Sequence, residues 1–245
     1  MAIWKKVVIF AIGLISLGFI WFVLSVLAPN KQKQVCKDII FTVSDYDKFQ
    51  FISEKDIQLQ LENANISPVN KMRDEVDLSV MEMKLQEMNM VKKSVCYFAV
   101  DGSLCVSVQQ RVPLFRIKTT YDDYYIDSER NRMPTSLKFT AHVPIITGSV
   151  KQDFAKNELY DFIKYIENSR QWTNMFTQII VLPDNRVELV PRIGNFIISM
   201  GELENFEGKL KKLHTFYNKA GDFYGGDKYY RVSLEFKDQV VCSKR

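Results

Sequence analysis

The sequence predicts an α+β protein in which a single N-terminal transmembrane helix precedes two folded domains. Three observations lead to this prediction. A long apolar stretch near the N-terminus carries no charge. The segment after it shows strand and helix periodicities in the order β-α-α-β-β. The remainder is dominated by short strand patterns with two helical patterns among them, which predicts a mixed β-sheet domain with two helices.

The composition restricts the class of protein before any motif is considered. Of the 245 residues, 47% are hydrophobic and 25% are charged, which matches a globular protein and excludes a largely disordered one. The chain has 33 basic and 29 acidic residues. The excess comes from Lys5, Lys6, Lys31 and Lys33, within the first 34 residues, which contain no acid. The rest of the chain is neutral, which argues against a nucleic-acid-binding protein.

The apolar stretch Val7–Leu27 has the length of a membrane-spanning helix. Its 21 residues contain no charge, and at ~1.5 Å per residue they extend about 31 Å, close to a hydrocarbon core of about 30 Å. A cleaved signal peptide is the alternative, but its apolar region usually has only about 7–15 residues. We therefore expect a short tail at 1–6, a transmembrane helix at 7–27 and a linker at 28–34. Lysines flank both ends, so charge alone does not determine the orientation.

Residues 35–112 are expected to form the first domain. A strand is predicted at 35–43. Ser53 is followed by acidic residues and is typical of a helix N-terminus. Apolar residues at spacings of three and four between 78 and 88 predict a second helix. Asp101-Gly102 lies between two strand-like runs, which predicts a hairpin with a two-residue turn.

Residues 113–245 are expected to form the second domain. Pro183-Asp-Asn185 lies between two strand-like runs and predicts another hairpin. Apolar residues at helical spacing predict helices over 153–168 and 203–216. The other short strands are predicted at 114–118, 124–127, 143–148, 179–182, 187–190 and 196–199.

The last strand pattern alternates closely between apolar and polar residues. Tyr230, Val232, Leu234 and Phe236 would share one face, and the residues between them are charged or polar. Because this strand lies near the C-terminus, nothing after it need pair with its free side. It is therefore expected to lie at a sheet edge.

No catalytic or metal-binding constellation is recognisable in the sequence. The only histidines, His142 and His214, belong to no zinc motif, and no phosphate-binding loop or nucleophile motif occurs. Asp122, Asp123 and Asp127 lack the spacing of a calcium-binding loop, so a solvated turn is the better interpretation. We expect no enzymatic activity, no cofactor and no metal.

The four cysteines are expected to be small buried thiols. With a two-residue turn at Asp101-Gly102, Phe98 would face Cys105, and Cys96 and Cys105 would be diagonal neighbours. Their Cα atoms would then lie roughly 7–8 Å apart, too far for a comfortable disulfide.

Several motifs follow one another along the chain. Residues 101–116 read Asp-Gly-Ser-Leu-Cys-Val-Ser-Val-Gln-Gln-Arg-Val-Pro-Leu-Phe-Arg, and Tyr124–Asp127, Met133-Pro134 and Val143–Gly148 come after them. In this order, behind a single anchor, they resemble the FtsQ/DivIB cell-division proteins. Further similar stretches are Val187–Gly194, Lys209–Tyr217 and Tyr229–Arg245. The chain departs from the family where a glycine is missing after Asp127 and where Thr135 replaces the usual leucine.

The resemblance implies a POTRA-like first domain, an FtsQ-type second domain and a non-enzymatic divisome scaffold. Such proteins keep a short cytoplasmic tail, cross the inner membrane once and hold both domains outside the cytoplasm, at the division septum. They recruit and regulate septal peptidoglycan synthesis by binding FtsB-like and FtsL-like partners. The POTRA domain is implicated in contacts with other division proteins, and the terminal strands accept FtsB as an added strand. The partner-binding residues that the resemblance implies are Tyr230, Val232, Leu234, Phe236, Asp238 and Gln239.

Other interpretations remain open at this point. The chain could be another membrane-anchored POTRA-bearing module, serving secretion or envelope assembly, or a membrane-anchored cell-wall hydrolase. The apolar face of the last strand could also pack on the penultimate helix, which would leave only main-chain groups for a partner.

Overall fold

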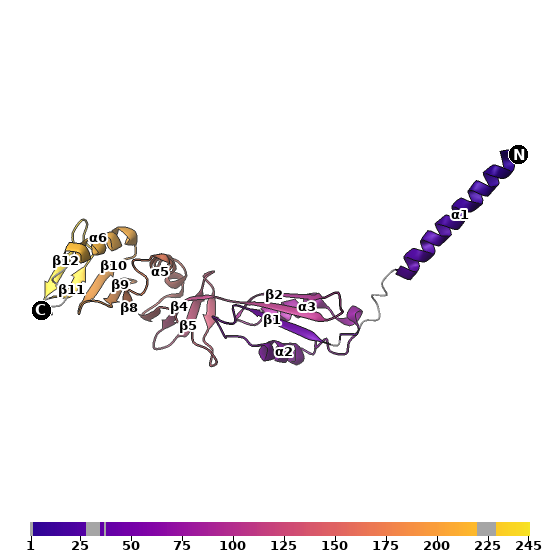
Figure 1. Ribbon diagram of the computed structural model, residues 1–245. Coiled ribbons are helices and arrows are strands. Elements are labelled where there is room, and N and C mark those ends of the chain that lie inside the picture. Colours follow the sequence, from indigo (N-terminus) through magenta and orange to yellow (C-terminus); the bar gives the residue numbers. More distant parts are fainter. Residues whose placement is uncertain (1, 28–34, 37, 220–228) are drawn as a thin grey trace.

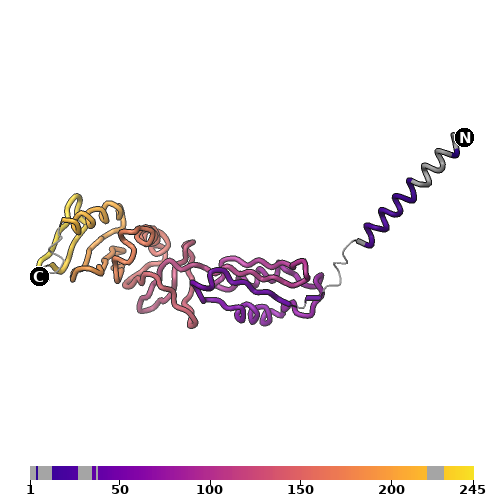
Figure 2. The backbone as a smooth tube through the Cα atoms, viewed as in Figure 1, coloured from indigo at the N-terminus to yellow at the C-terminus, as the bar shows by residue number. Residues whose placement is uncertain are grey.

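The computed structural model describes residues 2–27, 35–36, 38–219 and 229–245. Within these, the side chains of 2, 3, 5–12 and 27 are not described. The predicted linker 28–34 lies outside the described residues. Figures 1 and 2 show an elongated arrangement in which the two β-sheet regions follow one another lengthwise, with the C-terminus at the end farthest from the first sheet.

The N-terminal helix α1 spans Ala2–Leu27 and therefore includes the predicted span 7–27. Among the residues described with their side chains, no helix is both long enough and apolar enough to cross a membrane. The transmembrane anchor stays a prediction.

The first sheet region has the expected β-α-α-β-β order, with one additional 3-10 turn at Arg73–Glu75. The sheet has the strand order β1-β3-β2, in which β1 runs parallel and β2 antiparallel to β3. Its elements are β1 (Ile39–Ser44), α2 (Glu54–Asn63), α3 (Leu78–Gln86), β2 (Val91–Phe98) and β3 (Leu104–Gln110).

Local hydrogen bonds explain where these two helices begin. The N–H and hydroxyl of Ser53 donate to the Asp56 carboxylate at 2.9 and 2.7 Å, which starts α2 at the predicted position. The Asp77 carboxylate accepts the Val80 N–H at 3.1 Å and starts α3. Both helices bury apolar residues four apart, Ile57 and Leu61 in α2 and Met81 and Leu85 in α3.

The β2–β3 hairpin has a longer loop than predicted. Phe98 pairs with Leu104, so residues 99–103 form the connection, and Gly102 adopts a positive φ of 91°. The Ala99 N–H donates to the carbonyl of Ser103 at 2.9 Å and closes the loop. The prediction of a two-residue turn was wrong, because the Asp101 carboxylate accepts the N–H and hydroxyl of Ser103, at 3.0 and 2.7 Å, and stabilises a longer loop.

The longer loop changes the placement of the cysteines in the hairpin. Cys96 pairs with Val106, whereas Cys105 pairs with Tyr97. Side chains of successive residues alternate across a sheet, so Cys96 lies on the buried face and Cys105 on the outer face. The four cysteines are free thiols in the described structure.

In the part of the chain that the structure describes, the second sheet region contains nine strands in the order β12-β11-β10-β9-β8-β7-β4-β5-β6. Three adjacent pairs are parallel (β11–β10, β8–β7 and β7–β4) and the other pairs are antiparallel. The strands are β4 (Pro113–Lys118), β5 (Asp123–Asp127), β6 (Arg132–Pro134), β7 (Ile145–Gly148), β8 (Phe176–Val181), β9 (Val187–Pro191), β10 (Ile197–Gly201), β11 (Tyr229–Ser233) and β12 (Val241–Lys244).

Helices pack their apolar sides on this sheet. The single helix predicted over 153–168 is in fact two, α4 (Gln152–Lys156) and α5 (Glu158–Asn168), because Asn157 leaves the helical conformation with φ −116° and ψ −98°. The third helix is α6 (Phe206–Lys219). Their buried residues share one core with alternate residues of the strands, which shows that they cover one face of the sheet. The described residues of this domain therefore form three helices, where two were predicted.

The core of the three-stranded sheet continues past residue 112. Tyr125 and Met133, from β5 and β6, are fully buried in it. Phe51 packs edge-on against Tyr125, with ring centroids 5.8 Å apart, and against Phe139 at 4.9 Å. Apolar packing therefore connects the two sheet regions across the predicted boundary between 112 and 113.

Two adjacent residues at this boundary make different polar contacts. The buried side chain of Gln110 donates to the carbonyl of Phe49 at 2.7 Å and accepts the N–H of Ile52 at 3.1 Å. Arg111 donates to the Asp127 carboxylate at 2.8 Å. Gln110 thus holds the first core together, and Arg111 connects it to the second sheet.

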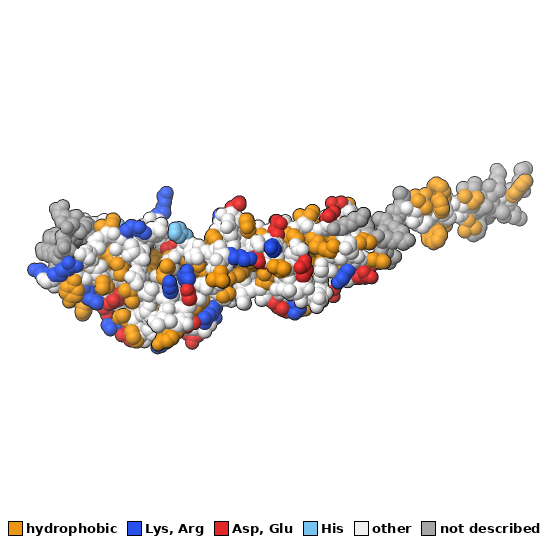
Figure 3. Space-filling view, turned by 90° about the horizontal axis from the view of Figure 1, so that it is seen from below, with side chains coloured by type: hydrophobic (Ala, Val, Ile, Leu, Met, Phe, Trp, Pro, Cys, Tyr) orange, Lys and Arg blue, Asp and Glu red, His pale blue; other side chains and the backbone are white. Residues whose placement is uncertain are grey.

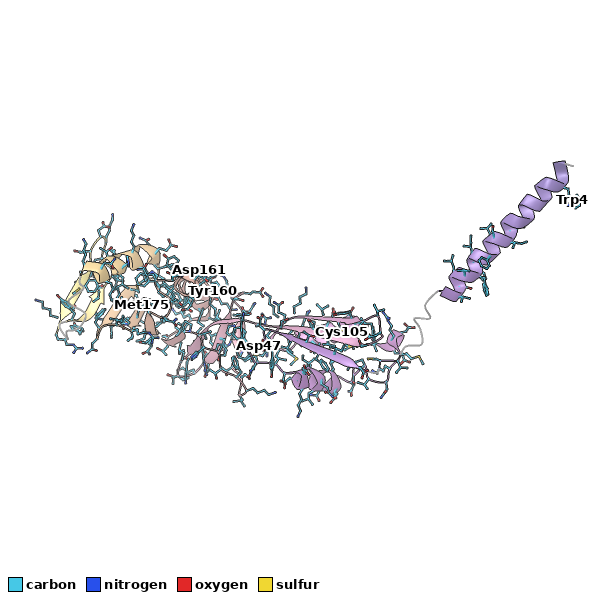
Figure 4. The ribbon with its side chains drawn as sticks, viewed as in Figure 1. Trp4, Asp47, Cys105, Tyr160, Asp161 and Met175 are labelled. Carbon is cyan, nitrogen blue, oxygen red and sulfur yellow. The ribbon has the colours of Figure 1, made fainter. Side chains whose placement is uncertain are left out.

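The turn at residues 127–131 contacts both sheet regions. The buried Asp127 carboxylate accepts the N–H groups of Glu129 and Asn131, each at 2.8 Å, in addition to Arg111. On the other side, the Tyr160 hydroxyl of α5 donates to the Ser128 carbonyl at 2.7 Å, and Figure 4 shows Tyr160 at this position on α5. The turn therefore joins α5 to the first region.

The other two aspartates of this segment also pair with arginine. The Asp122 carboxylate forms an ion pair with Arg132 at 2.8 Å, and the Asp123 carboxylate forms one with Arg116 at 2.6 Å. These carboxylates neutralise cross-strand cations.

Replacing Arg111 with methionine, R111M, should lower the free energy of unfolding by about 2 kcal/mol, because the buried Asp127 carboxylate loses a charged hydrogen-bond donor. Urea-induced unfolding measures the change. The matched control, R186M, removes Arg186 from Asp184, where both side chains are about half exposed. It should cost less than about 0.5 kcal/mol, and equal losses would contradict a structural role for Arg111.

The Asp56–Lys138 ion pair links α2 to the segment after β6. Burial opposes ionisation of Asp56, but the Lys138 ammonium and the Ser53 bonds outweigh it and hold the pKa of Asp56 below its ordinary value. A lowered folded pKa stabilises the fold above the unfolded pKa of about 3.9, and this contribution is lost as the pH falls through the folded value.

We therefore expect D56N to be less stable than the parent chain at neutral pH, with a difference that shrinks as the solution is acidified below pH about 4. Urea unfolding at a series of pH values measures this. A difference that stays constant across the series would show that charge on Asp56 is not involved.

Candidate functional site

The strand expected at the edge of the sheet is an interior strand. β11 pairs with β10 on one side, in parallel, and with β12 on the other, antiparallel. Arg231, for example, lies opposite Ile197 of β10 and Ser243 of β12. The prediction that Tyr230–Phe236 forms a free edge was therefore wrong, because a further short strand follows it. The edge at this end of the sheet is β12.

The apolar residues of this segment do not share one face. The pairing with β12 skips Tyr230, since Tyr229 pairs with Lys244 and Arg231 with Ser243. Such a bulge adds one residue to β11, so side chains before and after it no longer alternate regularly between the two faces of the sheet. Val232 and Leu234 are fully buried, whereas Tyr230 is 48% and Phe236 49% exposed.

Hydrogen bonds to α6 explain why β11 ends at Ser233. The Leu234 N–H still donates to the Ser199 carbonyl of β10 at 2.9 Å. The carbonyls of Leu234 and Phe236 accept hydrogen bonds from the ammonium group of Lys212, at 2.9 and 2.5 Å. Because these carbonyls are bound by a helix side chain, the chain leaves the sheet. It then reverses at Asp238, which has a positive φ of 58°.

This departure from the sheet leaves a groove of about 900 Å³ between α6 and residues 235–240. Three of the expected partner-binding residues line it, Phe236, Asp238 and Gln239. Tyr230 is exposed outside this lining, and Val232 and Leu234 belong to the core. The structure therefore brings together half of the expected set. The groove walls also include Phe216, Tyr229 and Val240.

The groove is rich in lysine. Lys209 donates to the carbonyls of Met200 and Glu202 at 3.0 and 2.6 Å, and its burial lowers its pKa. Lys211, Lys219 and Lys237 also line the groove. The arrangement offers ammonium groups beside aromatic side chains, which suits an anionic or amphipathic peptide and provides no nucleophile with a neighbouring base.

β12 completes the site as the outermost strand. Ser233 pairs with Val241 and Val232 with Cys242, so one side of β12 is occupied by β11. Among the described strands, none pairs with its other side. Burial raises the pKa of the Cys242 thiol, which keeps it protonated near neutral pH. Alternation over four residues is too short to predict such a strand, although the turn-forming Asp238 before it is a signal.

Family comparisons identify both sheet regions. A model described as POTRA-like domain matches residues 34–109, and one described as FtsQ/DivIB, C-terminal related, matches residues 112–243, more than half of the chain. The chain belongs to the FtsQ/DivIB family. No curated protein matches it in a direct comparison.

Membership in the FtsQ/DivIB family identifies the chain as a division-related scaffold that carries a POTRA-like domain. The two matched families are non-catalytic scaffold domains. In the described residues, no group of three or more His, Cys, Asp and Glu side chains is placed to hold a metal ion.

The burial difference between Leu234 and Phe236 can be tested directly. L234A should lower the free energy of unfolding by about 3 kcal/mol, because it leaves a cavity in the core. F236A should cost less than about 1 kcal/mol, because its ring is half exposed. Chemical denaturation of the two variants measures both values, and similar losses would favour the original placement of both residues on one face.

Proposed function

We propose that this FtsQ/DivIB protein is a bitopic inner-membrane scaffold of the divisome. It recruits and regulates septal peptidoglycan synthesis by binding FtsB-like and FtsL-like proteins, and it is not an enzyme. The observation that carries the proposal is the match of residues 112–243 to the FtsQ/DivIB C-terminal domain. The alternative POTRA-bearing module for secretion or envelope assembly would not need this second domain.

The proposed anchor is α1, with residues 1–6 in the cytoplasm and the two sheet regions outside it. The described part of α1 supports this placement, since large apolar side chains are exposed at Trp4 and between residues 14 and 26. A helix that is apolar on all sides is stable only when buried or in a membrane. The exposed residues are Trp4, Leu14, Ile15, Leu17, Phe19, Ile20, Trp21, Phe22, Leu24 and Val26.

The proposed partner site is the free side of β12 together with the groove beside α6. An extended partner segment can pair with the main chain of β12 and continue the sheet, which supplies affinity. Its side chains can then contact Phe236, Asp238 and Gln239, which supply specificity. Val232 and Leu234 act indirectly, by packing β11 against the core.

The proposal predicts that F236E weakens binding of an FtsB-like partner by at least about 30-fold, the size expected when an aromatic anchor is lost. Isothermal titration calorimetry measures the dissociation constant. The variant should fold normally, because the ring is half exposed.

Y121E is the matched control, since Tyr121 is an exposed aromatic residue in the β4–β5 connection. It should leave binding unchanged. Unaltered partner affinity in folded F236E would refute the groove as the partner site.

A further inference from the structure

The two outer strands of the three-stranded sheet differ in whether their free side is covered. β2 and β1 are the outermost strands, with β3 between them. An outer strand presents unpaired N–H and C=O groups, and proteins usually protect such groups with charges, proline or a covering element. Comparing these two edges therefore shows where this sheet can accept another strand.

The β2 edge is blocked by α3. The Glu82 carboxylate of α3 accepts the N–H of Cys96 at 2.7 Å, and the Ser94 hydroxyl donates to the Glu82 carbonyl at 2.8 Å. Lys92 and Lys93 add charge at the start of the strand. This edge has its main chain partly bound and carries the charges that discourage strand pairing.

Among the described residues, no side chain hydrogen-bonds to the main chain of Ile39–Val43, although Glu54 and Lys55 of α2 lie beside the β1 edge. The N–H of Leu104 donates to the carbonyl of Asp38 at 3.0 Å, and this bond determines which alternate residues of β1 are hydrogen-bonded to β3. With this pattern, the N–H and C=O groups of Ile39, Phe41 and Val43 point away from β3. The strand reads Ile-Ile-Phe-Thr-Val-Ser and contains neither charge nor proline.

A groove of about 460 Å³ runs beside this edge. One wall is the β1 segment 41–43, and the other is the beginning of α2, at residues 53–55. Tyr46 also lines it. The unpaired main-chain groups of β1 therefore face a slot between a strand and a helix, and an extended chain has the shape to enter such a slot.

The outer face of the sheet continues the apolar surface up to the same edge. Tyr97, Cys105 and Ile40 lie in register across β2, β3 and β1. Tyr97 is 52% and Ile40 50% exposed. Figure 4 places Cys105 on this sheet. Figure 3, a view from below, shows hydrophobic side chains among charged ones on the surface of the folded domains. A strand added beside β1 would place one more side chain next to Ile40, in line with Tyr97, Cys105 and Ile40.

We propose that the β1 edge is a second docking surface, separate from β12, which binds an extended segment of another protein by strand addition. The segment would be uncharged at its centre, with β-branched or aromatic residues on the face that enters the groove. One face would pack beside Phe41 and Val43 in the groove, and the other beside Ile40 on the outer face.

A second copy of this chain fits the edge less well. Pairing two β1 strands about a twofold axis perpendicular to the sheet puts both helical layers on the same side. The beginnings of the two α2 helices would then meet across the groove that the added strand must enter. A single extended segment brings no such helix.

A peptide with the sequence of residues 103–111, with serine in place of Cys105, is a suitable probe. These residues contain β3, whose side chains already match the spacing of β1 on its paired side. Titrating the fluorescein-labelled peptide with the full chain should give saturable binding by fluorescence anisotropy. Hydrogen exchange of the amides of Phe41 and Val43 should slow when the peptide is bound.

I40K and T42K should each weaken peptide binding by at least about fivefold, because a lysine at the edge opposes strand pairing. V95K is the matched control, since Val95 is a partly exposed apolar residue of the blocked edge strand β2. It should change the affinity less than about twofold.

Four results would overturn the proposal. The first is that the peptide shows no saturable binding, and the second is that it slows amide exchange in β12 and not in β1. The third is that V95K and I40K weaken peptide binding equally. The fourth is that amide exchange at Phe41 slows with rising protein concentration when no peptide is present. The last result would identify the edge as a contact between copies.

Discussion

Main-chain hydrogen bonding at the margins of the two sheets determines which surfaces this chain offers to partners. A carbonyl that leaves a sheet needs another donor. At the C-terminal end, Lys212 of α6 supplies it to Leu234 and Phe236, so the chain can leave β11, reverse and return as β12. The same contact places Phe236 beside α6 and opens the groove. One lysine thereby links the end of a strand, the new edge and the proposed partner site.

The same constraint distinguishes the other sheet margins. Glu82 binds a free N–H of β2, and at the far end of the larger sheet the three-residue strand β6 ends in Pro134. Such features discourage further strand pairing. β1 and β12 lack an equivalent covering contact among the described residues, and they lie in different sheets. A scaffold with two open edges can hold two extended partners at once, and the Arg111–Asp127 pair connects the regions that carry them.

Much of the fold was predictable because its signals are local. Ser53 and the acid at position 56 form the expected helix start, and apolar spacing predicted the buried faces of α3 and α6. The order of motifs predicted the family, which the matches confirm. The break at Asn157 was not predictable from periodicity, because residues on both sides of it keep a helical apolar spacing.

The candidate site shows where prediction from the sequence ended. The sequence by itself determined that the last forty residues contain an amphipathic helix and an apolar strand, since both patterns arise from residue spacing alone. Only the tertiary structure decided that Val232 is buried while Tyr230 and Phe236 are exposed, because a bulge places Tyr230 out of step with Val232 and Lys212 binds the chain outside the sheet at Phe236. Which strand lies at an edge depends on neighbours distant in sequence, such as β10, and no local pattern records them.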